Sequence, residues 1–402
     1  MASNRPSTLL LRVDGFGWQD CLATGPGSAI LGSLLFSALF PAPMSVKFLL
    51  RVAGTLLLAW AAAAACVALH TPLPWMLGPL VATSVLSMAG APTESWGPLR
   101  NGGQWAIGAA LGLYFTPEVS ALVGSLWWAI VLGIGWALLL GWGFGAWLYR
   151  LHAPRMHGVP ASMLRSTSYF AGAIGAASEM TLLSERENAR TDLVAASHSL
   201  RLLIVTITIP FALQWSGLQG LDILNPTVRE VSWTGLALLA LLTGAGALVM
   251  DRLGRANPWF MGAMLVSMAV TMAGLHLSAV PQALVNAAQL VIGVSLGVRF
   301  RAEFLHTAPR WLASVAVGTF GLMGICAAFA AVLAWATGLP WVTLLLGTSP
   351  GGITEMAITA KVLQLGVPVV TAFQVCRLIA VLMLVGPMYR RIYPPTKDGS
   401  AT

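Results

Sequence analysis

Long apolar segments without charge dominate this sequence and limit the environments in which it can fold. Leu122–Tyr149, Val231–Met250 and Trp311–Thr337 contain no Asp, Glu, Lys or Arg. Each is long enough to cross the hydrocarbon core of a bilayer, for which a helix needs about 20 residues. Only 9% of the 402 residues are charged, whereas soluble domains contain about 25%. The sequence therefore predicts an all-α, polytopic integral membrane protein with the lipid bilayer around it.

The first 43 residues differ in composition from the rest of the chain. Gly15–Gly32 is rich in glycine and polar residues, and Ser28–Pro41 is an apolar run too short to span a bilayer. Met44 directly precedes the first good apolar segment. We therefore expect 1–43 to be a dispensable leader, with a true start at Met44 favoured over a weak targeting segment.

Pairs of similar segments recur in the same order and indicate an internal duplication. Leu73–Gly90 and Asn257–Gly274 both contain Pro-Trp-x-x-Gly, and both end in Met-Ala-Gly. Asn101–Glu118 and Asn286–Glu303 share Asn-x-x-Gln-x-x-Ile-Gly-x-x-Leu-Gly-x-x-Phe-x-x-Glu, which is eight identities in eighteen positions. The two kinds of segment occur in the same order in both halves, so chance similarity is a poor explanation.

A third pair of segments places an acidic residue ahead of an arginine. Glu179 lies 22 residues before Arg201, and Glu355 lies 22 residues before Arg377. The polar link Ser216–Val231 separates the two halves. These features predict a first repeat, a second repeat and a cytoplasmic tail at residues 44–225, 230–392 and 393–402.

The distribution of Lys and Arg predicts how the repeats are oriented, because these residues concentrate in cytoplasmic loops. If each half crosses five times and the Glu segment enters and returns, sixteen basic residues fall inside and only Arg229 and Lys361 fall outside. If all twelve apolar segments cross, the same residues divide ten to eight. An odd number of crossings gives the halves opposite orientations, and such inverted-topology repeats are a recurrent plan in transporters.

A helix break is predicted within the membrane at Pro350-Gly351-Gly352, because proline lacks an N–H and glycine adds flexibility. Broken backbone is tolerated at this depth only inside protein or beside a water-filled cavity. The resuming helix would direct free N–H groups into that cavity. Together with Glu355 and nearby hydroxyls, the break could bind an anion or help to coordinate a cation. A plain kink or a surface loop is the structural alternative.

Two arginines lie within apolar segments, Arg201 in Leu193–Leu213 and Arg377 in Val369–Pro387. An unpaired arginine at the bilayer centre costs at least about 2.5–3.5 kcal/mol, so the two glutamates are the expected partners. The pairs could simply hold the halves in register. In the functional interpretation, one carboxylate exchanges a proton or sodium, while an arginine binds an anionic substrate or resets the carboxylate.

The second pair of repeated segments combines a small-residue packing pattern with amides. The pattern Gly-x-x-x-Gly occurs at Gly108 and Gly293 and favours close helix packing. The amides would share one helical face by their spacing and line the same cavity. The complete set of candidate substrate- or ion-binding residues is Glu355, Arg377, Glu179, Arg201, Thr348, Ser349, Pro350, Gly351, Gly352, Thr354, Ser178, Gln104, Gln289, Asn101 and Asn286.

At these motifs the sequence resembles the AbrB family of bacterial integral membrane proteins, from Met44 to Arg391. The family pattern Pro-Gly-Gly-x-[Ser/Thr]-Glu-Met stands at Pro350–Met356, followed by Arg377. Ile174–Met180 is the equivalent in the first half, where the proline and second glycine are absent, so a milder break is expected there. The resemblance implies a duplicated inner-membrane domain and loose kinship with antiporter- and symporter-like carriers. Family members are labelled regulators of gene expression or ammonia monooxygenases.

We expect a secondary transporter of a small solute coupled to protons or sodium, and not an enzyme. The four cysteines and six histidines show no metal-ligand spacing within the membrane, so no cofactor or metal is expected. The polar stretches are too short for a DNA-binding domain, so direct contact with nucleic acid is not expected. A membrane sensor that regulates gene expression indirectly is the alternative. The substrate, the coupling ion and a homo-oligomeric state stay open.

Overall fold

The computed structural model describes residues 45–156, 158–217, 230–275, 277–300 and 308–394. All regular structure in these ranges is helical. Two compact units are distinguished, Met1–Leu49 and Leu50–Thr402. Only residues 45–49 of the first unit are described, so the account below concerns the second unit. The predicted leader 1–43 and most of the predicted tail lie outside the described residues.

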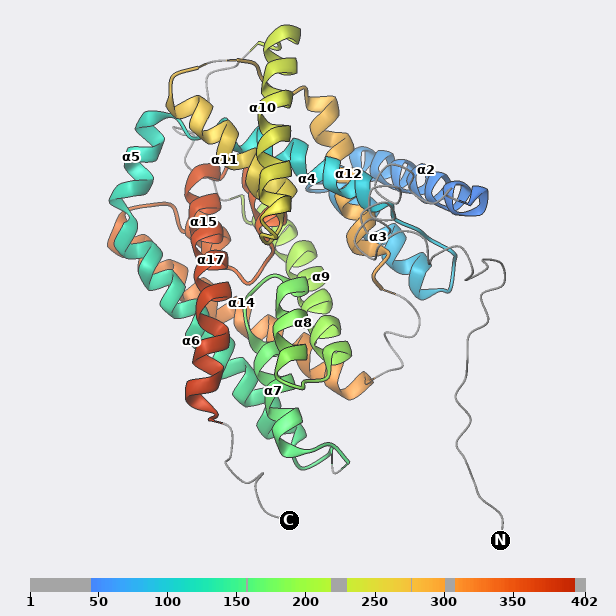
Figure 1. Ribbon diagram of the computed structural model, residues 1–402, viewed down its shortest axis with the longest axis vertical. Helices are drawn as coiled ribbons and strands as arrows, with labels where there is room; N and C mark the ends of the chain where they lie inside the picture. Colours follow the sequence, from blue (N-terminus) through green and yellow to red (C-terminus); the bar gives the residue numbers. More distant parts are fainter. Residues whose placement is uncertain (1–44, 157, 218–229, 276, 301–307, 395–402) are drawn as a thin grey trace, which may run out of the picture. The chain divides into compact units, whose positions relative to one another are not determined.

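The helices form two series in chain order (Figure 1). The first series comprises α2 (Val46–Ala68), α3 (Pro74–Met88), α4 (Gly97–Gly112), α5 (Pro117–Ser125), α6 (Trp127–His152), α7 (Ala161–Gly172), α8 (Ala177–Arg186) and α9 (Thr191–Ser216). The second series comprises α10 (Trp233–Arg252), α11 (Pro258–Met272), α12 (Gln282–Gly297), α14 (Pro309–Thr337), α15 (Trp341–Thr348), α16 (Ile353–Val362) and α17 (Val367–Ile392).

Six helices in the described part of the chain are long and apolar enough to cross a membrane, namely α2, α6, α9, α10, α14 and α17. A seventh span results if α4 and α5, bent by 89° at their junction, count as one. The helices α3, α11 and α12 are apolar but have only 15 or 16 residues. At 1.5 Å per residue, each is shorter than the roughly 30 Å hydrocarbon core. The chain is therefore a multi-pass, all-helical membrane protein, and its described residues contain six or seven full-length candidate spans.

Several pairs of corresponding helices in the two series have the same length, and one pair has the same local start. Both α3 and α11 have 15 residues, both α8 and α16 have 10, and both α9 and α17 have 26. The helices α3 and α11 begin with proline directly after a left-handed residue, Leu73 (φ 46°) or Asn257 (φ 50°). Proline suits the first helical position because its φ is already helical and its missing N–H needs no partner. The repeated Pro-Trp motif thus forms the same helix start twice.

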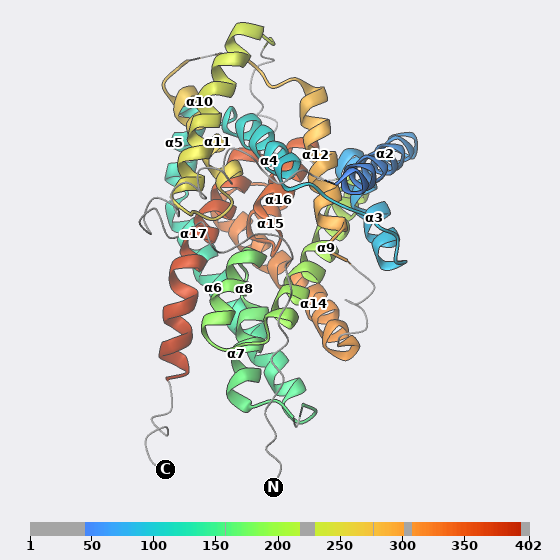
Figure 2. The same cartoon turned by 45° about the vertical axis from the view of Figure 1, so that its right-hand side comes forward.

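The first helices of each series pack across the two halves. The helix α4 packs on α11, and α12 packs on α3, so each half covers the other. The later helices, α6 to α9 and α14 to α17, contact one another extensively and form a second group. The helix α16 of this second group contacts α4, beside which it lies in the turned view (Figure 2). The boundary between the two groups is where the site described below is found.

The predicted small-residue packing is confirmed at the contacts between halves. A Cβ atom at Gly108 would lie 2.3 Å from the Phe260 carbonyl oxygen, and one at Gly293 would lie 2.5 Å from that of Met76. Phe260 and Met76 occupy matching positions after the two Pro-Trp motifs. Only glycine leaves room for a neighbouring backbone at this distance.

Candidate functional site

Two helix interruptions define the centre of the site. The second-half break, predicted at Pro350–Gly352, separates α15 from α16 at residues 349–352. The first-half break separates α7 from α8 at residues 173–176 and has the same length. The expectation of a milder first break is therefore wrong. The flanking residues Ala173 and Ala176 have negative φ and extended ψ, a backbone that alanine adopts without strain.

Arg201, in the middle of α9, binds the carbonyl groups exposed at the first break. Its guanidinium donates to the Ala171, Gly172 and Ala173 oxygens at 3.3, 3.2 and 2.7 Å. These carbonyls belong to the end of α7, where a helix has no internal partners for its last oxygens. The charged donor thus satisfies backbone acceptors that lipid could not.

Arg377, in the middle of α17, has the matching role at the second break. It donates to the Ser349 oxygen, to the Gly351 oxygen at 2.9 Å, and to the Gln374 side-chain oxygen. Both arginines are almost fully buried, with 3% and 6% of their surface exposed. The expected ion pairs with Glu179 and Glu355 are absent from the described part of the chain. Freed carbonyl groups, which the sequence pattern does not mark as acceptors, take the place of the carboxylates.

A polar residue three positions before each arginine completes the arrangement and was missed in the sequence. His198 contacts the Phe170 oxygen through Nε2 at 2.9 Å and the Arg201 guanidinium through Nδ1 at 2.8 Å. Gln374 donates to the Leu346 oxygen at 2.7 Å and accepts from Arg377. The signal was available, because an isolated polar residue one helical turn from an arginine in an apolar segment needs a partner.

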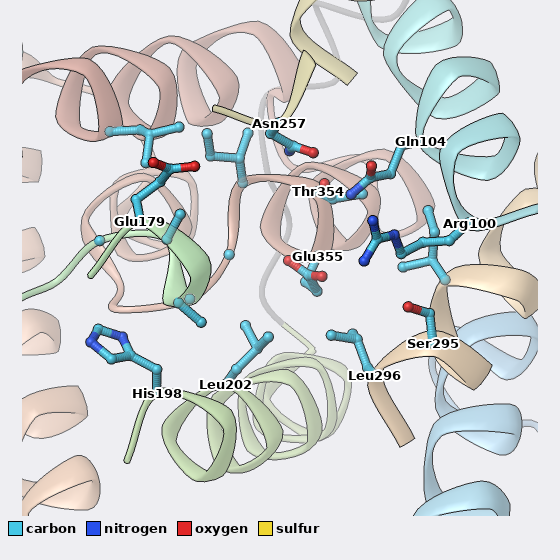
Figure 3. Close-up of a pocket in the computed structure, with 18 of the residues that line it drawn as sticks. Arg100, Gln104, Glu179, His198, Leu202, Asn257, Ser295, Leu296, Thr354 and Glu355 are labelled. Carbon is cyan, nitrogen blue, oxygen red and sulfur yellow. The ribbon is translucent and has the colours of Figure 1, made fainter. Parts of the chain in front are cut away.

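A cavity of about 380 Å³ brings both breaks together with α4, α9, α12 and α17 (Figure 3). Ten of the predicted site residues line it: Glu355, Arg377, Glu179, Arg201, Pro350, Gly351, Gly352, Thr354, Gln104 and Asn101. Glu355 is 6% exposed, whereas Glu179 is only half-buried. In Figure 3 the Gln104 amide points toward the Glu355 carboxyl group from the opposite wall.

Four predicted residues lie away from this cavity. Thr348 and Ser349 turn their hydroxyls back to the Leu344 and Leu346 oxygens of their own helix. Gln289 is buried outside the cavity lining, and Asn286 accepts a hydrogen bond from Gln282 at the surface. The side chain of Ser178 lies outside the described residues. The amides of the first half therefore reach the cavity, and their second-half equivalents do not.

The cavity lining is rich in charge, and four of its charged residues (Arg100, Arg255, Arg299 and Asp251) were not predicted from the sequence. It contains five arginines and three acidic residues, namely Arg100, Arg201, Arg255, Arg299 and Arg377 with Asp251, Glu179 and Glu355. The N-terminal ends of α8 and α16 also reach it, through Ala177 and Ile353. Within the described ranges, no three His, Cys, Asp or Glu side chains are grouped as a metal site would require. The site is a charged, partly buried cavity between two groups of helices.

Comparison with known proteins gives one family and two distant relatives. A family described as "Transition state regulatory protein AbrB" matches residues 75–393. A Bacillus subtilis (strain 168) protein, the uncharacterized YhjN, is 25% identical over 79% of this chain and 87% of its own length. An Escherichia coli (strain K12) protein provisionally named the regulator AbrB is 26% identical over 82% of this chain and 94% of its own length.

Proposed function

The chain belongs to the AbrB family, and we propose that it is a secondary transporter of a small solute, coupled to protons or sodium, in a bacterial inner membrane. The observation that carries the proposal is the cavity of about 380 Å³, lined by two interrupted helices and two intramembrane arginines. Ionisable residues within membrane segments are costly and typically mark substrate or ion pathways. Transporters commonly place such sites at the meeting point of broken helices.

The paired helix series supports an inverted repeat. Several pairs of corresponding helices match in length, and each half packs its short helices on the other. The Lys and Arg distribution favours five crossings per half, which would place the two halves in opposite orientations. Such a repeat allows one cavity to open alternately to either side of the membrane.

A membrane sensor is the second candidate, and the name of the Escherichia coli relative favours it. A sensor would bind its solute in the same cavity without moving it, and any effect on transcription would be indirect. No enzymatic activity or direct nucleic-acid binding is proposed. Reconstitution into vesicles separates the candidates, because a transporter produces flux of a bound solute and a sensor produces binding alone.

Replacing Glu355 with glutamine tests the coupling role. The variant keeps the size and shape of the side chain but cannot gain or lose a proton. We expect Glu355→Gln to insert into the membrane normally and to lose solute-driven proton or sodium movement, measured with an ion-sensitive dye inside vesicles.

The matched control is Glu185→Gln, which changes an exposed carboxylate at the end of α8 outside the cavity lining. It should retain the coupled flux of the unmodified protein. Equal flux in Glu355→Gln would remove this carboxylate from the mechanism.

A further inference from the structure

The charge of the cavity points to the class of solute. Its five arginines exceed its three acidic residues by two formal charges. Two helix N-termini, those of α8 and α16, add partial positive charge and free N–H groups to the same space. Arg201 and Arg377 are already committed to the carbonyl groups at the breaks. The other three arginines form no hydrogen bond to either break among the described residues, so they are better placed to bind a ligand.

Arg100 has unused hydrogen-bonding capacity inside the cavity. Its Nε atom is buried and has no partner, and its only side-chain hydrogen bond in the described part is a long one of 3.4 Å to Asn101. A buried donor without a partner is costly. Figure 3 shows the Arg100 guanidinium pointing into the cavity toward Glu355. No ion pair joins these two side chains in the described ranges.

Glu355 is a buried acidic group that lines the same space. Only 6% of its surface is exposed, and it forms no ion pair among the described residues. The Arg100 and Glu355 side chains both line the cavity and face each other in Figure 3, so one ligand can contact both. An oxyanion would accept from the guanidinium, and a protonated Glu355 could donate to the same ligand.

The repeat shows that Arg100 is not needed for the fold of its helix. Arg100 immediately precedes Asn101, and the matching position before Asn286 is Val285. Arg299, two residues after the end of α12, likewise matches the uncharged Tyr114 after α4. The helices α4 and α12 have the same length, so each forms without the charge found at the matching position of the other. Both arginines line the cavity, and the uncharged residues that match them do not.

We infer that the cavity takes a small oxyanion, a carboxylate or a phosphate, which binds the Arg100 guanidinium beside the N-termini of α8 and α16. The inference deepens the proposed transport function and rests on it for the direction in which the solute moves. The binding step itself requires only the geometry of the cavity.

An anion beside Arg100 also favours a proton on Glu355, because two negative charges in one partly buried cavity repel each other. The elements packed against α16 contribute Arg100 from α4, His198 and Arg201 from α9, and Arg377 from α17, while α15 contributes no charged residue. Arg299 also faces the cavity. Binding of the anion and binding of the proton therefore help each other, and by linkage the effect is reciprocal.

The test compares probes of matched shape and different charge on the purified full chain. Succinate, benzoate and inorganic phosphate are compared with succinamide, benzamide, 1,4-diaminobutane and benzylamine for their effect on the unfolding temperature. We expect at least one oxyanion to stabilise the protein more at pH 6 than at pH 8, and the neutral and cationic probes to have no effect. Stabilisation by a neutral or cationic probe alone, or by none of the probes, would overturn the inference.

Variants then locate the binding group. Arg100→Gln should weaken the effective oxyanion by at least about tenfold, the loss of one charged hydrogen bond. Arg100→Lys should retain part of the affinity because it keeps the charge. Arg252→Gln, which changes an exposed arginine outside the cavity, should bind as the unmodified protein does. Unchanged binding in Arg100→Gln contradicts the assignment. Weaker binding in Arg100→Gln together with unchanged binding in Arg100→Lys supports it.

Flux measurements separate this inference from the transport proposal. If the oxyanion binds through Arg100 but does not enter vesicles, the site stands and the transporter proposal fails. If vesicles accumulate a neutral or cationic probe instead, the transporter proposal stands and the oxyanion site fails.

Discussion

At the scale of single residues, Arg201 and Arg377 show how an interrupted helix is made acceptable inside a membrane. A break leaves carbonyl oxygens without intrahelical partners, and lipid offers no donors. Each guanidinium supplies several donors from the middle of a neighbouring long helix. The cost of burying the charge is offset because charged hydrogen bonds are stronger than neutral ones. The arginines therefore hold the breaks in place, whatever ligand the cavity binds.

Replacing Arg377 with glutamine should destabilise the protein. The shorter, neutral side chain cannot reach both the Ser349 and Gly351 oxygens, and each lost charged hydrogen bond is worth about 1.5–3 kcal/mol. We expect a clear fall in the thermal unfolding temperature in detergent. Arg391→Gln, an exposed change in the last turn of the same helix, should leave that temperature unchanged. Equal stability of the two variants would show that the carbonyl contacts are dispensable.

At the scale of helices, the two halves are joined by backbone contacts that only glycine permits. Gly108 of α4 faces α11, and Gly293 of α12 faces α3, at matching positions of the repeat. No large apolar effect drives helices together in lipid, so close packing has to supply the attraction. The packing of α4 on α11 also positions the start of α4, which brings Arg100 and Gln104 to the cavity.

Adding a single methyl group should separate these helices. Gly108→Ala and Gly293→Ala each place Cβ within 2.5 Å of a carbonyl oxygen, and such overpacking costs about 1–3 kcal/mol. Gly102→Ala is the control, because it lies in the same helix as Gly108 with no atom within 4 Å of the added methyl. Alanine favours helix by up to about 1 kcal/mol over glycine, so this variant should be at least as stable. Unfolding in detergent distinguishes the three variants.

At the scale of the whole molecule, a repeated chain gives an unequal site. The two breaks, the two arginines and their polar neighbours match across the halves, as His198 and Gln374 illustrate. The cavity nevertheless includes Asn101 and Gln104 but not Asn286 and Gln289. A transporter of inverted repeats, observed with its cavity open on one side, would show this inequality. In the opposite state we expect the second-half amides to line the pathway.

Chemical labelling tests the inverted arrangement. Asn188, after α8, and Gln364, after α16, are exposed and share a left-handed backbone, with φ of 52° and 54°. In a background without native cysteines, we expect Asn188→Cys to react with a membrane-impermeant maleimide only from the cytoplasmic side and Gln364→Cys only from the opposite side. Labelling of both from one side would contradict opposed orientations.

The sequence alone determined the lipid environment, the helical class, the repeated motifs and the second helix break. These follow from composition and local pattern, since charge-free segments need lipid and Pro350-Gly351-Gly352 cannot continue a helix. Only the tertiary structure decided the partners of the buried arginines, the full first break and the place of Arg100 in the cavity. Those depend on which backbone groups remain unpaired after packing and on which distant helices meet. No short stretch of sequence encodes which backbone groups stay unpaired or which distant helices meet.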